Sequence, residues 1–218
     1  LPDINFKNLK KIKRLMWNNY GRTFAEYMFI KEFRNGKISK NIEIDGQEIL
    51  EKIKKENSQV IFISGHFSNF ELMAMHLEKS GINLCAIYRP LNNIFLNGIM
   101  ERIRKKYICK HQIKKGISGT REIIRLYKKG FSIALMIDQR VSEGIKLSFF
   151  GQPAFTTTIP AQLVKKFNCR IVPIYIERID KFYYKLKINR PIKFEKDQSI
   201  ENISTILNQE LEKMILKQ

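Results

Sequence analysis

The fold is decided by one stretch, Gln59-Val-Ile-Phe-Ile-Ser-Gly-His-Phe-Ser-Asn-Phe-Glu71. Residues 59–64 are mainly β-branched or aromatic and are followed by Gly65, which predicts a short buried strand. Residues 69–79 then change to a helical pattern that ends at Ser80-Gly81. A buried strand followed by a turn and a helix is the unit from which parallel sheets are built.

The same alternation continues on both sides of this stretch. Further strands are predicted at residues 83–88, 131–137, 146–150, 170–177 and 183–188, the last two as possible neighbours. Helices are predicted at residues 8–33, 47–56, 94–107, 120–129 and 159–167, with a last one that begins near Asp197 or Ser199 and reaches Met214. No repeat or linker divides the chain. We therefore predict one α/β domain, residues 1–218, with a mainly parallel, mixed central sheet covered by helices on both faces.

Composition excludes several classes of protein. The chain has 218 residues, of which 44% are apolar and 11% aromatic, so disordered and low-complexity classes do not fit. Lysine and arginine total 40 against 21 acidic residues, and the resulting charge of +19 favours anionic partners. The apolar run at residues 133–137 is far shorter than the roughly 18–20 residues that cross a bilayer. Three widely spaced cysteines form no disulfide or zinc pattern and are interpreted as packing residues.

A histidine and a carboxylate in the deciding stretch could carry chemistry. His66 follows the predicted strand, and Glu71 comes five residues later. On one helix this spacing would separate the two by about 140°, so they can meet only if His66 lies in the turn before the helix. A carboxylate on one imidazole nitrogen would make the other nitrogen a general base. Taken alone, the pair is more often a structural histidine, and the H-E-x-x-H spacing of a zinc site is absent.

The run His66-Phe-Ser-Asn-Phe-Glu71 resembles the H-x4-E motif of the bacterial lipid A biosynthesis acyltransferases of the lauroyl/myristoyl type. These enzymes are related to the lysophospholipid and glycerol-3-phosphate acyltransferases, whose fold the resemblance implies. Further blocks are similar to those of the family, in the same order and over roughly residues 9–215: Tyr88-Arg89-Pro90 with Asn92-Asn93, Arg102, Gly119-Thr120-Arg121, Ile137-Asp138-Gln139, and Phe149-Phe150-Gly151 with Pro153 and Thr156.

The resemblance implies an O-acyltransferase of lipid A and lipopolysaccharide biosynthesis. The donor would be an acyl carrier protein or coenzyme A thioester, and the acceptor a hydroxyl of a phosphorylated glycolipid. We expect His66 to be the general base and Glu71 to orient it, with no metal or cofactor. Candidates for oxyanion binding are the backbone amides near Asn69 and the Arg89 side chain. Arg89, Arg121 and Arg140 are candidates for binding phosphates, and Asp138 for substrate contact or loop stabilisation.

Two departures from the family and several alternatives accompany this interpretation. The hydrophobic N-terminal helix and the tryptophan-containing C-terminal block of the family are absent from this sequence, so the chain is expected either to be trimmed at both ends or to come from a shortened relative, for which the acceptor would stay open. The expected location is the cytoplasmic face of the bacterial inner membrane, on an anionic surface. The basic residues at positions 100–129, eleven against two acidic ones, could dock an acidic carrier protein or lipid headgroups. Alternatives are another membrane-lipid acyltransferase, a family member without turnover, and a nucleic-acid-binding module; no RNA- or DNA-binding signature appears, so no nucleic acid partner is expected.

Overall fold

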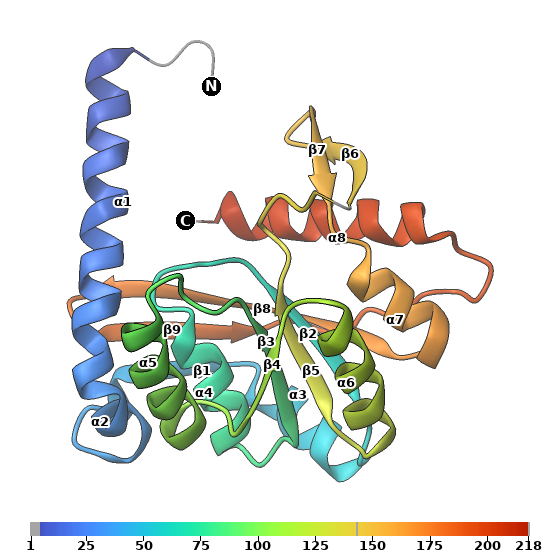
Figure 1. Cartoon of the computed structure of the whole chain (residues 1–218), viewed down its shortest axis with the longest axis horizontal. Coiled ribbons are helices and arrows are strands. Elements are labelled where there is room, and N and C mark those ends of the chain that lie inside the picture. The colour runs from blue at the N-terminus through green and yellow to red at the C-terminus, as the bar shows by residue number, and fades with distance from the viewer. Residues whose placement is uncertain (1–4, 143, 218) are drawn as a thin grey trace.

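Seven strands form the central sheet of the computed structural model, which describes residues 5–142 and 144–217 (Figure 1). Their order across the sheet is β1-β9-β8-β2-β5-β3-β4, and neighbouring strands are parallel except β8 and β9. Their bounds are β1 Ile42–Asp45, β2 Val60–Ser64, β3 Leu84–Tyr88, β4 His111–Lys114, β5 Ser132–Met136, β8 Arg170–Asp180 and β9 Tyr183–Ile188. The prediction of a mainly parallel, mixed sheet is confirmed.

Helices cover both faces of this sheet. Their bounds are α1 Phe6–Glu26, α2 Ile30–Asn35, α3 Gln47–Lys55, α4 Glu71–Lys79, α5 Ile94–Tyr107, α6 Ile117–Lys128, α7 Ile159–Phe167 and α8 Ile200–Ile215. The connections through α4 and α5 run along the sheet toward β4, whereas those through α6 and α7 run back. Because such crossovers are right-handed, the two pairs lie on opposite faces. A two-stranded antiparallel sheet, β6 Ile145–Phe149 and β7 Gln152–Thr156, packs beside α8 (Figure 1).

Local sequence explains these elements. All five residues of β2 are buried, as expected of a strand covered on both faces. The Ser199 side chain accepts a hydrogen bond from the Asn202 backbone N–H and caps α8, which settles the choice between the two predicted caps. The three cysteines are free and buried, in agreement with packing roles.

The structure divides one predicted helix and adds three strands to the predicted elements. The helix predicted at residues 8–33 is divided, since α1 ends at Glu26 and a 3₁₀ turn, Tyr27–Phe29, precedes α2. This break falls where Glu26 and Tyr27 turn their side chains into the buried interior. Strands β1, β4 and β7 were not predicted. The first two are four-residue edge strands that carry polar residues, and β7 contains Pro153, so each lacks the apolar pattern of an inner strand.

Candidate active site

The ends of β2 and β5 bring a histidine and an aspartate together. Ser64 of β2 is the register partner of Met136 of β5, and His66 and Asp138 follow each of them by two residues. The Ile137 backbone N–H donates to the Ser64 carbonyl oxygen at 2.9 Å and extends this pairing past the strands. Parallel strands therefore deliver His66 and Asp138 to the same edge of the sheet, where α/β proteins bind ligands.

Asp138 holds His66 by two hydrogen bonds. Its Oδ1 lies 2.7 Å from Nδ1 of the ring, and its Oδ2 accepts from the His66 backbone N–H at 2.7 Å. The close approach suits Gly65, because a Cβ there would lie 3.2 Å from Asp138 Oδ2 and 3.1 Å from the Phe67 ring, tighter than ordinary contact, and these side chains would have to shift. Phe70 supports the ring from another side, with centroids 4.8 Å apart in an edge-to-face arrangement.

This pairing fixes the tautomer of the neutral ring. An ionised carboxylate can only accept hydrogen bonds, so Nδ1 carries the proton, and in the neutral ring Nε2 carries the lone pair. Burial opposes ionisation of Asp138, but the hydrogen bonds and charge of His66 outweigh burial and lower the pKa of this carboxyl group. The arrangement can act as a general base at Nε2, with a carboxylate behind it that would stabilise the imidazolium.

Glu71 has other partners, which corrects the expected contact between His66 and Glu71. The carboxylate of Glu71 is buried, and its Oε1 accepts from Arg104 Nε at 2.9 Å, from Arg104 Nη2 at 2.5 Å, and from the hydroxyl of Tyr27. Burial, together with the charge of Glu71, raises the pKa of Tyr27. Burial alone would lower the pKa of Arg104, but Glu71 raises it. Glu71 thus joins the start of α4 to α5 and to the turn after α1.

A cavity of about 490 Å³ opens beside His66. Its polar lining includes His66, Glu71, Arg89 and Arg104, and most of its remaining lining is apolar. Small side chains contribute to its lining: Ala86 of β3 and Ala134 of β5 are register partners that lie side by side in the sheet, and Ala74 of α4 also lines the cavity. Pockets of 300–1,000 Å³ with apolar walls and a few polar groups are typical of small-molecule sites.

The other predicted binding residues occupy different places. Arg89 is exposed and lines the cavity, whereas Arg121 is exposed on α6 and is not among the residues that line it. Arg140 lines a second cavity of about 450 Å³ and lies over the Phe155 ring at 5.5 Å. The Asn69 side chain is 1% exposed, donates from Nδ2 to Glu26, and is not among the residues that line either cavity.

Sequence reasoning missed Arg104 and Tyr27. The resemblance to the family points to Arg102 in the same helix, which is exposed and donates from Nε to the Gly98 carbonyl oxygen. In the sequence, Arg104 is one of eleven basic residues at positions 100–129. It differs from exposed neighbours such as Arg102 only because it lies on a half-buried face of α5. Within the described chain, no group of three or more histidine, cysteine or acidic side chains could hold a metal ion.

Comparisons with known proteins agree with this architecture. The family model described as bacterial lipid A biosynthesis acyltransferase matches residues 1–218. The Escherichia coli (strain K12) protein named lipid A biosynthesis myristoyltransferase is 23% identical over 143 residues, and Shigella flexneri lipid A biosynthesis acyltransferase 2 is 24% identical over 143 residues. Each match covers 64% of this chain and only 43% and 44% of the respective relative. The match of the family model along the whole chain places this protein in the bacterial lipid A biosynthesis acyltransferase family.

Proposed function

We propose that this protein transfers a fatty acyl chain from a thioester donor to a hydroxyl group of a phosphorylated glycolipid, a precursor of lipid A. The observation that carries the proposal is the His66 ring, held at Nδ1 by Asp138 beside an apolar cavity, whose Nε2 makes no hydrogen bond among the described residues, in a chain of this family. The named relatives support lipid A as the acceptor class. The donor is an acyl carrier protein or coenzyme A thioester.

The proposed reaction needs one base and no covalent enzyme intermediate. His66 Nε2 takes the proton of the acceptor hydroxyl as its oxygen attacks the thioester carbonyl carbon. The tetrahedral intermediate then collapses, the carbon–sulfur bond breaks, and the imidazolium returns its proton to the departing thiolate. Asp138 stabilises the imidazolium formed between these steps. Base catalysis of this kind contributes about 10²- to 10⁴-fold in rate.

Charged and apolar parts of the cavity suit different parts of the substrates. Arg89 lies exposed at the cavity and makes no hydrogen bond or ion pair within the described chain, so its guanidinium is available for an acceptor phosphate or the oxyanion. The alanine-lined interior suits a hydrocarbon chain, because each buried methylene contributes about 0.8 kcal/mol. Glu71 and Arg104 neutralise each other at 2.5 Å and define one wall.

Acyl transfer by the purified protein tests the proposal. The donor arms are a fatty acyl carrier protein and the matching acyl coenzyme A, and the acceptor arms are a lipid A precursor and a lysophospholipid. Mass spectrometry should detect one added acyl chain on the lipid A precursor, and His66→Gln should abolish it. Transfer only to the lysophospholipid would assign a different membrane-lipid acceptor. Undiminished transfer by His66→Gln would contradict the mechanism.

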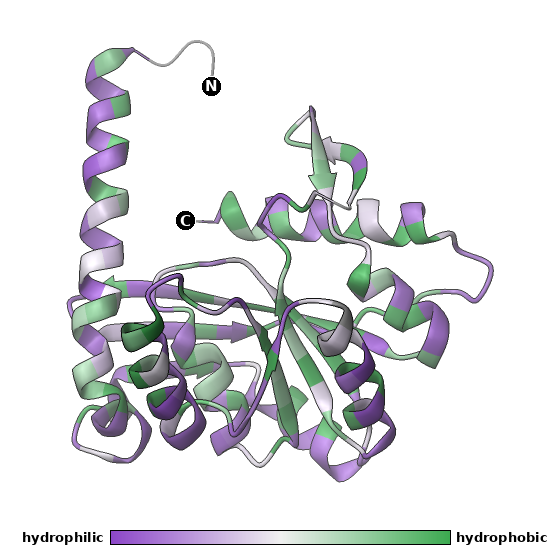
Figure 2. Ribbon diagram, in the orientation of Figure 1, coloured by the Kyte–Doolittle hydropathy of each residue, from purple (hydrophilic) through white to green (hydrophobic). Residues whose placement is uncertain are grey.

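We also propose that α1 and the start of α5 meet an anionic bilayer. The outer part of α1 projects beyond the body of the protein, with apolar and polar residues interspersed (Figures 1 and 2). Its exposed apolar side chains include Phe6, Leu15 and Trp17, and those of α5 include Ile94 and Phe95. The basic residues of α1 are Lys7, Lys10, Lys11, Lys13, Arg14 and Arg22, and its only acidic residue is the buried Glu26. Apolar side chains with lysines and arginines are typical of interfacial helices.

The α5 part of this surface lies close to the cavity. Residues 90–92, which lead into α5, line the cavity. A lipid acceptor could therefore reach His66 from the membrane. No helix in the described part of the chain is long and apolar enough to span a bilayer.

Trp17 provides a direct test, since it is the only tryptophan of the chain and its side chain lies on α1. Vesicles that contain phosphatidylglycerol should shift its fluorescence to the blue, and raised salt should reverse the shift. Lys10→Glu combined with Arg14→Glu should weaken binding by at least about 30-fold, taking about 1 kcal/mol for each basic residue. The matched control, Lys52→Glu with Lys55→Glu on α3, should bind as the unmodified chain does. Equal weakening by both pairs would contradict this surface.

A further inference from the structure

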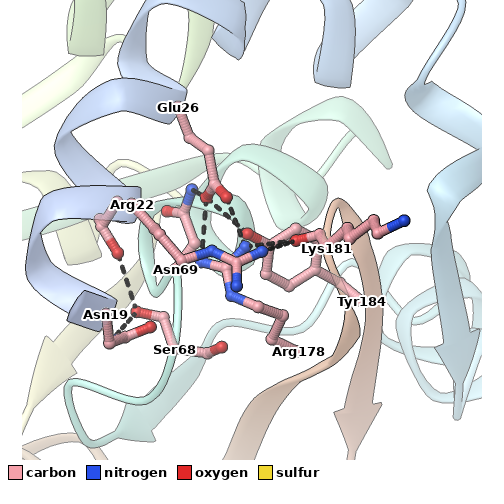
Figure 3. A network of polar contacts seen from close by, with 9 residues as sticks. Asn19, Arg22, Glu26, Ser68, Asn69, Arg178, Lys181 and Tyr184 are labelled. Atoms are coloured by element: carbon pink, nitrogen blue, oxygen red, sulfur yellow. Dashed lines mark hydrogen bonds and ion pairs between the residues drawn. The ribbon is translucent and has the colours of Figure 1, made fainter. Parts of the chain in front are cut away.

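A buried carboxylate at the end of α1 gathers donors from three parts of the chain. Glu26 is 2% exposed, and its oxygens accept from Asn69 Nδ2 at 2.7 Å, from Arg178 Nη2 at 3.2 Å, from Arg178 Nη1, and from the Tyr184 hydroxyl (Figure 3). Arg178 lies on β8 and Tyr184 on β9. A buried charge is tolerated when it is paired and fully hydrogen-bonded in this way.

Asn69 belongs to the turn that carries His66, and the residue before it is also held by α1. The Ser68 carbonyl oxygen accepts from Asn19 Nδ2 at 3.2 Å and from Thr23 Oγ1 at 3.3 Å. Ser68 has a φ of +47°, a left-handed conformation that a serine adopts only when its surroundings hold it there. Three side chains of α1 therefore determine the path of residues 68 and 69, as Figure 3 shows for Asn19, Glu26, Ser68 and Asn69.

The position of the His66 ring depends on this path. His66 and Phe70 are four residues apart in the same turn, and their rings pack at 4.8 Å. The hydrogen bond from His66 Nδ1 to Asp138 is 2.7 Å long, so a displacement of the turn by about 1 Å would break it. Such small displacements of a catalytic group can cost about 100-fold in rate.

We propose that Asn19, Thr23 and Glu26 are positioning residues for the turn that carries His66. They hold the Ser68 carbonyl and the Asn69 side chain, and thereby keep the His66 ring on Asp138, without contact to substrate. The inference rests on the proposed function, because it takes His66 as the general base. It makes α1 a structural part of the active site as well as a membrane surface.

The decisive variant is Asn19→Ala combined with Thr23→Val, which removes both donors to Ser68 but leaves the buried charges of Glu26 and Arg178 paired. The kcat for acyl transfer should fall by about 10- to 100-fold, with the KM for the donor within about twofold. Thr23→Ser, which keeps the hydroxyl group, should retain most of the activity. The matched control is Asn18→Ala, because Asn18 is exposed and makes no hydrogen bond within the described chain; it should behave as the unmodified chain does.

A spectroscopic readout separates this inference from the function itself. The nitrogen-15 spectrum of the His66 ring, assigned by comparison with His66→Gln, is recorded about two pH units above the ordinary imidazole pKa. The unmodified chain should show one tautomer, protonated at Nδ1, and the double variant a mixture of both. An unchanged tautomer with unchanged kcat in a folded double variant would overturn the inference. If the unmodified chain transfers no acyl group, the proposed function fails, and the tautomer still decides whether α1 positions His66.

Discussion

Replacement of Asp138 by asparagine tests which carboxylate serves His66. The amide of Asp138→Asn can still accept the His66 backbone N–H through its oxygen, but its NH₂ group then faces Nδ1 of the ring. To accept a hydrogen bond from this NH₂ group, Nδ1 must be unprotonated, so the proton of the neutral ring lies on Nε2. Nε2 then has no lone pair with which to act as the general base. We expect kcat to fall by about 10²- to 10⁴-fold, the full contribution of a positioned base. Because the Asp138 side chain is 24% exposed, the melting temperature should change little.

Glu71→Gln is the matched comparison, since it makes the same change, from carboxylate to amide, in a residue that lines the cavity beside His66. It leaves Arg104, whose side chain is 12% exposed, without its counter-charge. Loss of one partner of a buried ion pair costs about 3–5 kcal/mol, which corresponds to about 6–20 °C in melting temperature for a chain of this size. Stopped assays of acyl transfer measure kcat for both variants, and thermal unfolding measures their melting temperatures. If Asp138→Asn keeps kcat within about threefold, while Glu71→Gln loses turnover at an unchanged melting temperature, the assignment of Asp138 is refuted.

Three further outcomes are expected. Ala134→Leu adds three carbons inside the cavity and should shift preference toward shorter acyl donors, by about 60-fold for a loss of three buried methylenes; an unchanged chain-length profile would exclude this cavity as the acyl site. Arg89→Ala should raise the KM for a phosphorylated acceptor by about 10- to 100-fold and leave that of a dephosphorylated acceptor unchanged, as steady-state kinetics would show. Burial, together with the charge of Lys79, lowers the pKa of His76 to about 4. Between pH 6.5 and 4, His76 is therefore protonated in the unfolded chain and neutral in the folded chain. The free energy of unfolding should fall by up to about 3 kcal/mol over this range, and denaturant titrations of His76→Gln should show a smaller fall.

Much of the fold could be predicted from sequence because its inner elements carry strong local signals. Helices α5 and α7 and strand β9 have the predicted bounds, since each combines a regular apolar pattern with clear ends. Strands β1 and β4 could not be predicted from the apolar pattern, because they lie at the edges of the sheet and an edge position requires few apolar residues. The position of His66 at the end of a buried strand is also confirmed.

The partner of His66 could not be predicted by the same reasoning. Glu71 was the expected partner because it is only five residues from His66 in the sequence, whereas Asp138 is 72 residues from His66. Their contact depends on β5 lying beside β2 in the sheet, although two strands intervene along the chain. Strand order is a property of the assembled sheet, and local patterns carry no information about it. The ion pair between Glu71 of α4 and Arg104 of α5 could not be predicted for the same reason, because it depends on how the two helices pack in the assembled fold.

The pairing of Ser64 with Met136 has a consequence for folding. A slip of one residue between these strands would reverse the faces of every side chain on one of them and carry the imidazole away from its acid. Chains with an incomplete or misaligned sheet would therefore have no working base, however much helix they had formed. Recovery of turnover during refolding would then report when these two central strands have found their correct alignment.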